Sequence, residues 1–410
     1  MPTTWIQLSQ QLVQQTPGFT PPVAARAYGY IGVTLYEAVV AGMPEYQSLA
    51  GQLSRLRTLP KVATGTAYHW PTVANTALAT IIRQLFATAT PENQAAIDDL
   101  EAEFTAEFAM QVEPTIFTAS VVYGQAVANA IFVWSKSDGG HEGYYRNHPK
   151  SYTPPVGEGL WTPTPKHFAH ALQPTWGRNR PFVTAIGMRC AAPPPPAFST
   201  AKESAFYQSA LEVYNTVKTL TPEQKEIVLF WADDPITTAT PAGHSVAIAT
   251  ALLQQEEASL ARAALVYAHV GIAVNDAFIS VWRTKFRYNL VRPITYIQQH
   301  IDQRWNNPEV TDPIATPPFP AYTSGHAGEA GAAMTVLTAL FGENYAFVDR
   351  THIGRGFAPR AYDSLMAAAE EAALSRLYGG IHYRFDNEMG LQQGVCVGKQ
   401  VLRLKFQVRD

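Results

Sequence analysis

Cysteine is almost absent from this chain, which holds only Cys190 and Cys396 in 410 residues. Two cysteines cannot form the dense disulfide framework of small secreted domains, and their distant positions lack the short spacings of zinc sites. We expect two free or buried thiols, since unpaired cysteine is among the most buried residue types. A hydrophobic core must therefore hold the fold together, and the redox compartment stays open.

Charge is also scarce, because Asp, Glu, Lys and Arg make up only 15% of the residues. The formal net charge is −3, so no general basic field attracts nucleic acid or an anionic membrane. We expect no nucleic-acid partner, and any anion site must be local. The apolar fraction of 47% is large enough for a substantial core. Such a composition is also compatible with subunits that cover one another, as in a homo-oligomer.

Long hydrophobic runs are rare as well. The N-terminus, MPTTWIQLSQQLVQQ, has neither a basic flank nor an apolar centre, so we expect no signal peptide, although a leader removed on export is compatible with the sequence. One stretch, residues 114–135, is free of charge and long enough to cross a membrane. Polar residues such as Gln125 and Asn129 interrupt it. We predict a buried helix there and a soluble protein without a membrane span, whose compartment the sequence leaves open.

Sustained alternation of apolar and polar residues is missing, and so is any repeat of 20 to 50 residues, which argues against β-rich folds and solenoids. Apolar residues instead recur at spacings of three and four, for example over 23–43, 72–89 and 91–110, and again from residue 201 onward. These patterns predict an all-α protein. We expect a large helical bundle, either single or made of two packed four-helix-type bundles.

The stretch from 136 to 199 breaks this helical pattern. It is rich in Pro, Gly, Trp and Tyr, and such a composition cannot sustain a helix or strand for long. Its aromatic residues indicate an ordered loop that covers the bundle. We therefore divide the chain into an N-terminal helical half with the covering loop, residues 1–199, and a C-terminal helical bundle, residues 200–410.

Three segments of the C-terminal half carry chemistry, and the first is KFRYNLVRP, residues 285–293. Lys285 and Arg292 are seven residues apart, so they lie on one helix face two turns apart. Pro293 ends or kinks that helix. The two side chains can thus reach a common point. The alternative is a pair of solvated surface residues, since Lys and Arg are mostly exposed.

The second segment is FPAYTSGHAGEAGAA, residues 319–333, where Thr323 or Ser324 can cap a helix of small residues. A helix start presents free N–H groups and a positive dipole end, which favour an oxyanion. Gly325 lets the backbone approach a ligand closely. His326 stands beside this site, where it can give or take a proton. The alternative is an ordinary capped helix with an incidental histidine.

The third segment is SRLYGGIHYRFD, residues 375–386. Arg376 and His382 are six residues apart and would not share a face of one continuous helix, but the glycine pair between them marks a helix end or sharp bend. Asp386, four residues after His382, can accept a hydrogen bond from one ring nitrogen and leave the other free. The alternative is a C-capping arginine with a hydrogen-bonded core histidine.

Together the three segments form a binding set for a tetrahedral oxyanion. Three cations neutralise a phosphate-like charge without bound Mg²⁺. One histidine would be the nucleophile or metal ligand, and the other would be the acid or base. The residues that would hold the oxyanion are Lys285, Arg292, Ser324, Gly325, Arg376 and His382.

The pattern K-x6-RP, SGH and SR-x5-H-x3-D resembles the signature of the superfamily that joins vanadium-dependent haloperoxidases to type 2 phosphatidic acid phosphatases. The spacing within each motif is met over about a hundred residues, from Lys285 to Asp386. One departure is Thr323, where the family usually has proline before SGH, which affects the turn more than the chemistry. The resemblance agrees with the all-α prediction, because the family's soluble members are helical bundles.

The resemblance also implies roles. The position of His382 belongs to the axial vanadium ligand or, in phosphatases, to the histidine that is phosphorylated. His326 matches the acid–base histidine, and the cations, Lys285 especially, would polarise bound peroxide. Asp234 resembles an aspartate that pairs with the motif arginine, with Asp233 as the alternative match.

Two aromatic residues favour the haloperoxidase branch, since Trp282 and Phe319 resemble the pair that flanks the halide region in chloroperoxidase-type members. The resemblance thus implies a vanadate-dependent haloperoxidase that oxidises halide with hydrogen peroxide to hypohalous acid, which acts on a small-molecule substrate. The alternative is a soluble acid phosphatase of the same superfamily with a phosphohistidine intermediate. Phosphate would then occupy the same pocket, as it also would when vanadate is missing. A third class, a non-catalytic anion-binding protein, would not need His326.

Overall fold

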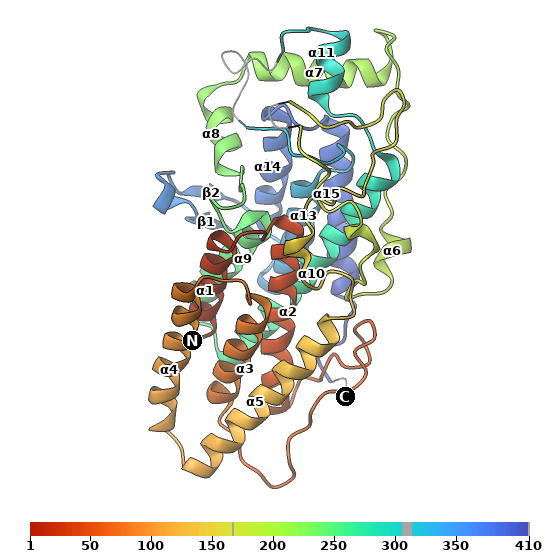
Figure 1. Ribbon diagram of the computed structural model, residues 1–410. Coiled ribbons are helices and arrows are strands. Elements are labelled where there is room, and N and C mark those ends of the chain that lie inside the picture. The colour runs from red at the N-terminus through yellow and green to blue at the C-terminus, as the bar shows by residue number, and fades with distance from the viewer. Residues whose placement is uncertain (166–167, 306–313, 409–410) are drawn as a thin grey trace.

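The computed structural model describes residues 1–165, 168–305 and 314–408, and helices dominate it (Figure 1). The helices of the N-terminal half are α1 (Pro2–Gln15), α2 (Pro21–Val39), α3 (Trp70–Leu85), α4 (Pro91–Ala109) and α5 (Pro114–Ser135). The C-terminal half contains α7 (Ala205–Lys218), α8 (Pro222–Phe230), α9 (Thr240–Gln255), α10 (Leu260–Tyr288), α11 (Pro293–His300), α13 (Gly325–Phe341), α14 (Leu365–Tyr378) and α15 (Arg384–Val401). Strands β1 (Phe347–Asp349) and β2 (Arg360–Tyr362) form one small antiparallel hairpin. The all-α prediction is confirmed.

The centre of the molecule is α10, whose most apolar 18 residues are entirely buried. Helix α2 packs along it, and glycine makes this close approach feasible: a Cβ at Gly271 would lie 2.6 Å from the carbonyl oxygen of Tyr28. Helices α13 and α15 also pack against α10. One hydrophobic core therefore contains residues of both halves, from Trp5 to Phe406. The division at residue 199 stays a prediction.

Helix α5 corrects one expectation. The predicted helix over 114–135 exists, but only a third of its most apolar window is buried, and Val122 and Val133 are 60% and 65% exposed. Its charge-free sequence reflects a surface helix with one packed face rather than a core helix. By length and composition alone both α5 and α10 could cross a membrane, so the expectation of one such stretch, 114–135, is wrong for the described part of the chain.

The stretch from 136 to 199 is an irregular covering loop with three short helical turns, η2 (Gly143–Tyr145), η3 (Trp176–Arg178) and α6 (Ile186–Arg189). Trp161 and Trp176 are buried, as an ordered loop requires. Asp276 of α10 fastens the loop by accepting hydrogen bonds of 2.8 Å from the backbone N–H groups of Phe182 and Val183. The loop therefore covers the helix that leads to Lys285.

A disulfide bond joins Cys190, at the end of α6, to Cys396 in α15, with 5.6 Å between the Cα atoms. The expectation of two free or buried thiols is therefore wrong. The cysteines are 206 residues apart, and only the return of the covering loop to α15 brings them together. Sequence spacing alone does not show such a long-range contact.

Replacing both cysteines by alanine is expected to lower the free energy of unfolding by about 2–4 kcal/mol, because the bridge closes a long loop and restricts the unfolded chain. Guanidinium denaturation of the double variant beside the wild type measures the difference. Thiol titration of denatured, unreduced protein is the control. Detection of two free thiols in that sample would contradict the bridge.

Candidate functional site

The three motif segments meet where α10, α13, α14 and α15 come together. Arg292 ties them to one another: its Nε donates to the carbonyl of Phe319 at 2.7 Å, and one Nη donates to the carbonyl of Ile381 at 2.6 Å. The backbone N–H of Ser324 donates to the carbonyl of Asp386 at 2.9 Å. Residues a hundred positions apart in sequence thus surround one point. The prediction that Lys285 and Arg292 lie on one helix face is wrong, because α10 ends between them and Arg292 is the extended N-cap of α11.

His382 stands in the turn between α14 and α15. Its Nδ1 donates to Asp386 at 2.9 Å, and its Nε2 lies 3.1 Å from a guanidinium nitrogen of Arg292. Because arginine only donates, Nε2 carries a lone pair and Nδ1 carries the proton. Burial and three neighbouring cations, Arg292 first, hold the pKa of His382 well below its usual range. The ring is therefore neutral, and the lone pair of Nε2 is directed at Arg292.

Asp386 orients this histidine. One carboxylate oxygen accepts from His382 and from the backbone N–H of Tyr383, while the other has no hydrogen-bond partner and is buried. Burial raises the pKa of Asp386 to about 7, although Lys285 and Arg292 act in the opposite direction. The expected His382–Asp386 contact is therefore present in the structure.

Lys285 is fully buried at the end of α10. Its Nζ donates to the carbonyls of Pro320 and Ala321, each at 2.9 Å, and one of its three N–H groups remains for a ligand. Burial, followed by the charge of Arg292, lowers the pKa of Lys285 well below its usual value. Its Nζ lies 4.9 Å from the ring centre of Phe319, which also contacts Trp282. The two predicted aromatic residues therefore stand beside the cations.

An anion would complete this site. One guanidinium nitrogen of Arg292 is buried without a hydrogen-bond partner, and a charged donor of this kind needs an acceptor. Ser324 caps α13 by accepting from the N–H of Ala327, so its hydroxyl proton is free to donate. The start of α13, at Gly325, adds backbone N–H groups and the positive helix end. The donors present thus suit a tetrahedral oxyanion.

Arg376 and His326 are held by the backbone at the end of α8 and just after it. Arg376 is buried and donates to the carbonyls of Trp231, at 2.7 Å, and Val228, at 3.3 Å. His326, partly exposed, donates from Nε2 to the carbonyl of Ala232 at 3.3 Å. Burial, and then the charge of Arg376, keeps the pKa of His326 well below its usual range. His326 is therefore a neutral base next to the cations.

The aspartates expected to pair with the motif arginine act on it only at longer range, since the charges of both oppose the lowering of its pKa by burial. Asp234 is exposed, and in the described part of the chain no ion pair within 4 Å joins Arg376 to either Asp234 or Asp233. Backbone carbonyls take the place of a carboxylate partner for Arg376. Asp233 is buried and binds His244 and His352 instead.

Known proteins share the sequence and the fold of this chain. Residues 265–410 match the family model of the VCPO second helical-bundle domain. A solved bacterial vanadium-dependent iodoperoxidase is 34% identical, covers 99% of this chain and 96% of its own, and superposes with a TM-score of 0.88. This chain belongs to the vanadium-dependent haloperoxidases.

More distant relatives extend the comparison. A solved holo-type bacterial vanadium-dependent chloroperoxidase shares the fold at a TM-score of 0.67 and 18% identity, over 96% of each chain. A vanadium chloroperoxidase from Curvularia inaequalis is 24% identical over 354 residues, which cover 66% of this chain. The match spans 57% of the length of that Curvularia protein.

Sequence reasoning missed one supporting residue of this haloperoxidase. Gln393 of α15 accepts from the hydroxyl of Thr323 at 2.6 Å and donates to Ser280 and Thr284 of α10. It lies seven residues after Asp386 and hence on the same helix face, which is the signal that could have indicated it. Where the family usually has proline, the threonine hydroxyl is therefore anchored to α15.

Glu329, one turn beyond His326 on α13, was missed as well. It is 2% exposed, and one carboxylate oxygen has no hydrogen-bond partner. Burial raises its pKa from 4.5 to about 8. A lone glutamate among small residues carried no sequence signal, since only packing shows that it faces inward.

Because the pKa of Glu329 is raised, the effect of Glu329→Gln on stability should depend on pH. The folded state binds this proton more tightly than the unfolded state, so the contribution to stability is full below about pH 4.5 and is lost as the pH rises through about 8. Glutamine mimics the neutral form, so the Tm of the variant relative to the wild type should increase between about pH 5 and pH 9. Thermal melts over that range measure it, and a constant difference would contradict the raised pKa.

Proposed function

We propose that this protein is a vanadate-dependent haloperoxidase that oxidises halide with hydrogen peroxide to hypohalous acid. The observation that carries the proposal is the buried Arg292 nitrogen without a partner, next to the neutral Nε2 of His382. Both atoms suit vanadate, one as a donor to its oxygens and one as a ligand to the metal. Among the relatives, the 34% identical protein is a vanadium-dependent enzyme by its title.

The residues that would hold vanadate have separate tasks. His382 Nε2 would bind vanadium, since Asp386 keeps the proton on Nδ1. Lys285 and Arg292 would donate to vanadate oxygens from the positions where their carbonyl contacts already hold them. The remaining donors would be Ser324, the N–H of Gly325, and Arg376.

Bound vanadate would supply a Lewis acid that activates hydrogen peroxide for attack by halide, so that peroxide is reduced, halide is oxidised and vanadium keeps its oxidation state. The protein supplies proton transfer. Because the carbonyl of Ala232 only accepts, the proton of neutral His326 is on Nε2, and Nδ1 is free to take a proton from peroxide.

We propose iodide as the preferred halide. Iodide is the easiest of the three common halides to oxidise, and the relative with 34% identity is titled an iodoperoxidase. Trp282 and Phe319 are the residues that we assign to the halide region. Phe319 contacts the charged ends of both Lys285 and Arg292 at 4.9 Å, so an anion beside this ring would lie near two cations.

The experiment uses purified protein that has been stripped of phosphate and reloaded with orthovanadate. Oxidation of iodide, bromide and chloride by peroxide is assayed with and without vanadate, beside hydrolysis of p-nitrophenyl phosphate by vanadate-free protein. We expect vanadate-dependent oxidation, fastest with iodide. Brisk ester hydrolysis that vanadate inhibits, with no oxidation of any halide, would instead support the soluble phosphatase.

A further inference from the structure

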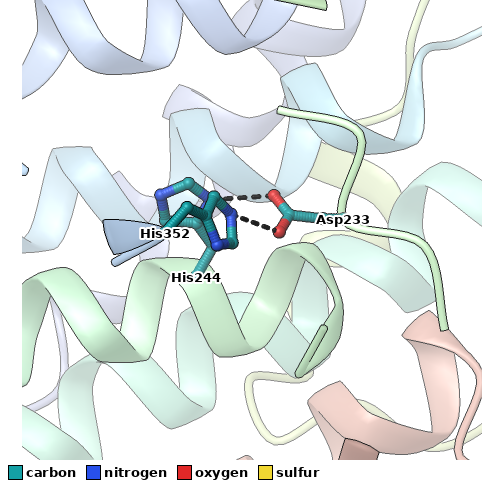
Figure 2. A group of neighbouring side chains, drawn as sticks. All are labelled: Asp233, His244 and His352. Atoms are coloured by element: carbon teal, nitrogen blue, oxygen red, sulfur yellow. Dashed lines mark hydrogen bonds and ion pairs between the residues drawn. The ribbon is translucent and has the colours of Figure 1, made fainter. Parts of the chain in front are cut away.

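A second cluster of buried titratable groups lies next to the site, and Figure 2 shows three of its members. Both carboxylate oxygens of Asp233 are engaged: one accepts from His244 Nδ1 at 2.8 Å and the other from His352 Nε2 at 3.0 Å. His244 Nε2 donates to Asp349, at the end of β1, also at 2.8 Å. We call Asp233, His244, Asp349 and His352 the His244 clamp.

His244 is an imidazolium in this arrangement. Carboxylates only accept, so both ring nitrogens must carry protons. Burial alone would lower the pKa of His244, but the charges of Asp233 and Asp349 raise it to about 10. The indole ring of Trp231 stacks on the imidazolium, with 4.4 Å between ring centres and 18° between planes, which favours a cation further.

A metal ion is the competing explanation, because Asp233, His244 and His352 offer ligand atoms within 4.8 Å of one another. Two distances speak against it. Ligands of a tetrahedral ion bound at about 2.0–2.1 Å are roughly 3.3 Å apart, whereas the contacts of Asp233 are 2.8 and 3.0 Å, typical of hydrogen bonds. Both nitrogens of His244 are also already occupied by carboxylates. The cluster is therefore a hydrogen-bonded network.

The network holds the backbone at Asp233 in a strained conformation. Asp233 has a φ of +48°, in the left-handed region, which persists only where surrounding contacts hold it. The two residues before Asp233 provide the carbonyls of the site: Trp231 accepts from Arg376, and Ala232 accepts from His326. A shift of Asp233 would therefore move the acceptors of both side chains.

We propose that the His244 clamp is a positioning device, in which the imidazolium holds Asp233 so that the carbonyls of Trp231 and Ala232 aim Arg376 and His326 at the oxyanion. A test of this proposal by halide oxidation rests on the proposed function. A test by anion binding does not, since Arg376 would hold phosphate as well as vanadate. None of the four clamp residues needs to touch the anion.

The test compares His244→Gln with a matched control, His269→Gln. His269 is also buried and stacks on an aromatic ring, Phe406, but its described contacts lie near the other end of α10. The dissociation constants of orthovanadate and of phosphate are measured by calorimetry on vanadate-free protein, with circular dichroism and Tm as folding controls. Peroxide-dependent iodide oxidation gives kcat and the KM for iodide.

His244→Gln should weaken vanadate and phosphate binding about tenfold or more and lower kcat, with the KM for iodide unchanged, because outer partners of a ligated centre typically contribute 10- to 100-fold. His269→Gln should leave the binding constants and kcat as in the wild type. A purely structural role for His244 would lower the Tm and the number of binding-competent molecules, but not the affinity of the folded ones. Wild-type affinity in folded His244→Gln would overturn the proposal.

If His244→Gln does not fold, Asp349→Asn tests the same network, since it removes one carboxylate charge and leaves His244 with Asp233. Weaker binding by this variant supports the clamp, and wild-type binding overturns it. A stoichiometric transition metal in the purified wild type, whose removal weakens vanadate binding, would also overturn it. Failure of the wild type to oxidise halide, with tight phosphate binding, would reject the proposed function alone, and the phosphate constants would still test the clamp.

Discussion

Replacing His382 by alanine is expected to abolish vanadate-dependent halide oxidation and to weaken vanadate binding by more than about 100-fold. The estimate is a lower bound, because losing even an outer partner of a metal ligand costs about 10- to 100-fold. Here the ligand itself is lost, together with the neutral Nε2 that Asp386 and the surrounding cations maintain. Calorimetric titration with vanadate and peroxide-dependent iodide oxidation measure the two effects.

The phosphate affinity of the variant shows whether only the metal ligand is lost or the whole anion site is disrupted. Phosphate is held by the cations rather than by a bond to His382, so the alanine variant should still bind it, within about tenfold of the wild type. His269→Ala, which removes a buried histidine of α10, is the control for generic damage and should retain activity. Retention of vanadate-dependent turnover by the His382 variant would show that another group binds the metal.

Much of the site could be predicted because its residues are grouped in short motifs with fixed spacing. Lys285 and Arg292 both reach the site, but not from one helix face, because α10 ends between them and Arg292 is the N-cap of α11. His382 reaches Asp386 by a separation of four. The helix start at Ser324 follows from its capping chemistry. Local spacing carries this information because each motif is short, although the first one runs from the end of α10 to the start of α11.

The remaining features depend on contacts between segments far apart in the chain. The fold brings together residues that are far apart in the sequence, as in the disulfide bond between Cys190 and Cys396 and the contact of His244 with Asp349. No local spacing indicates which distant residues will meet. Among the described residues Asp234 forms no close ion pair with the motif arginine for a similar reason: Asp233 is buried and Asp234 is exposed. Periodicity likewise could not tell a packed surface helix, α5, from a core helix such as α10.

Three cations are buried close together, and each needs hydrogen-bond acceptors that the sequence motifs do not show. Lys285, Arg292 and Arg376 are each at most 1% exposed, and an unpaired buried charge is costly. Backbone carbonyls from the 319–321, 228–231 and 381 positions accept from them, so the cations stay fixed even before an anion binds. Preorganised donors of this kind lose little on binding or during the reaction.

Arg292→Lys tests whether geometry or charge matters more in this preorganised set. Lysine retains the positive charge but lacks the planar fork, so it cannot donate to the carbonyls of Phe319 and Ile381 while directing a further nitrogen at the anion. We expect kcat/KM for peroxide to fall by about 10²–10³, or about 2.7–4 kcal/mol of transition-state stabilisation. Vanadate affinity should fall in the same direction.

Arg292→Ala and Arg287→Lys complete this series. Alanine removes charge and fork together, so any loss beyond that of the lysine variant measures the contribution of charge. Arg287, exposed near the same end of α10, lies outside the set of anion donors, and its replacement by lysine should leave kcat/KM unchanged. Near wild-type activity of Arg292→Lys together with an inactive Arg292→Ala would mean that charge alone suffices. The unpartnered guanidinium nitrogen would then not be the group that recognises the oxyanion.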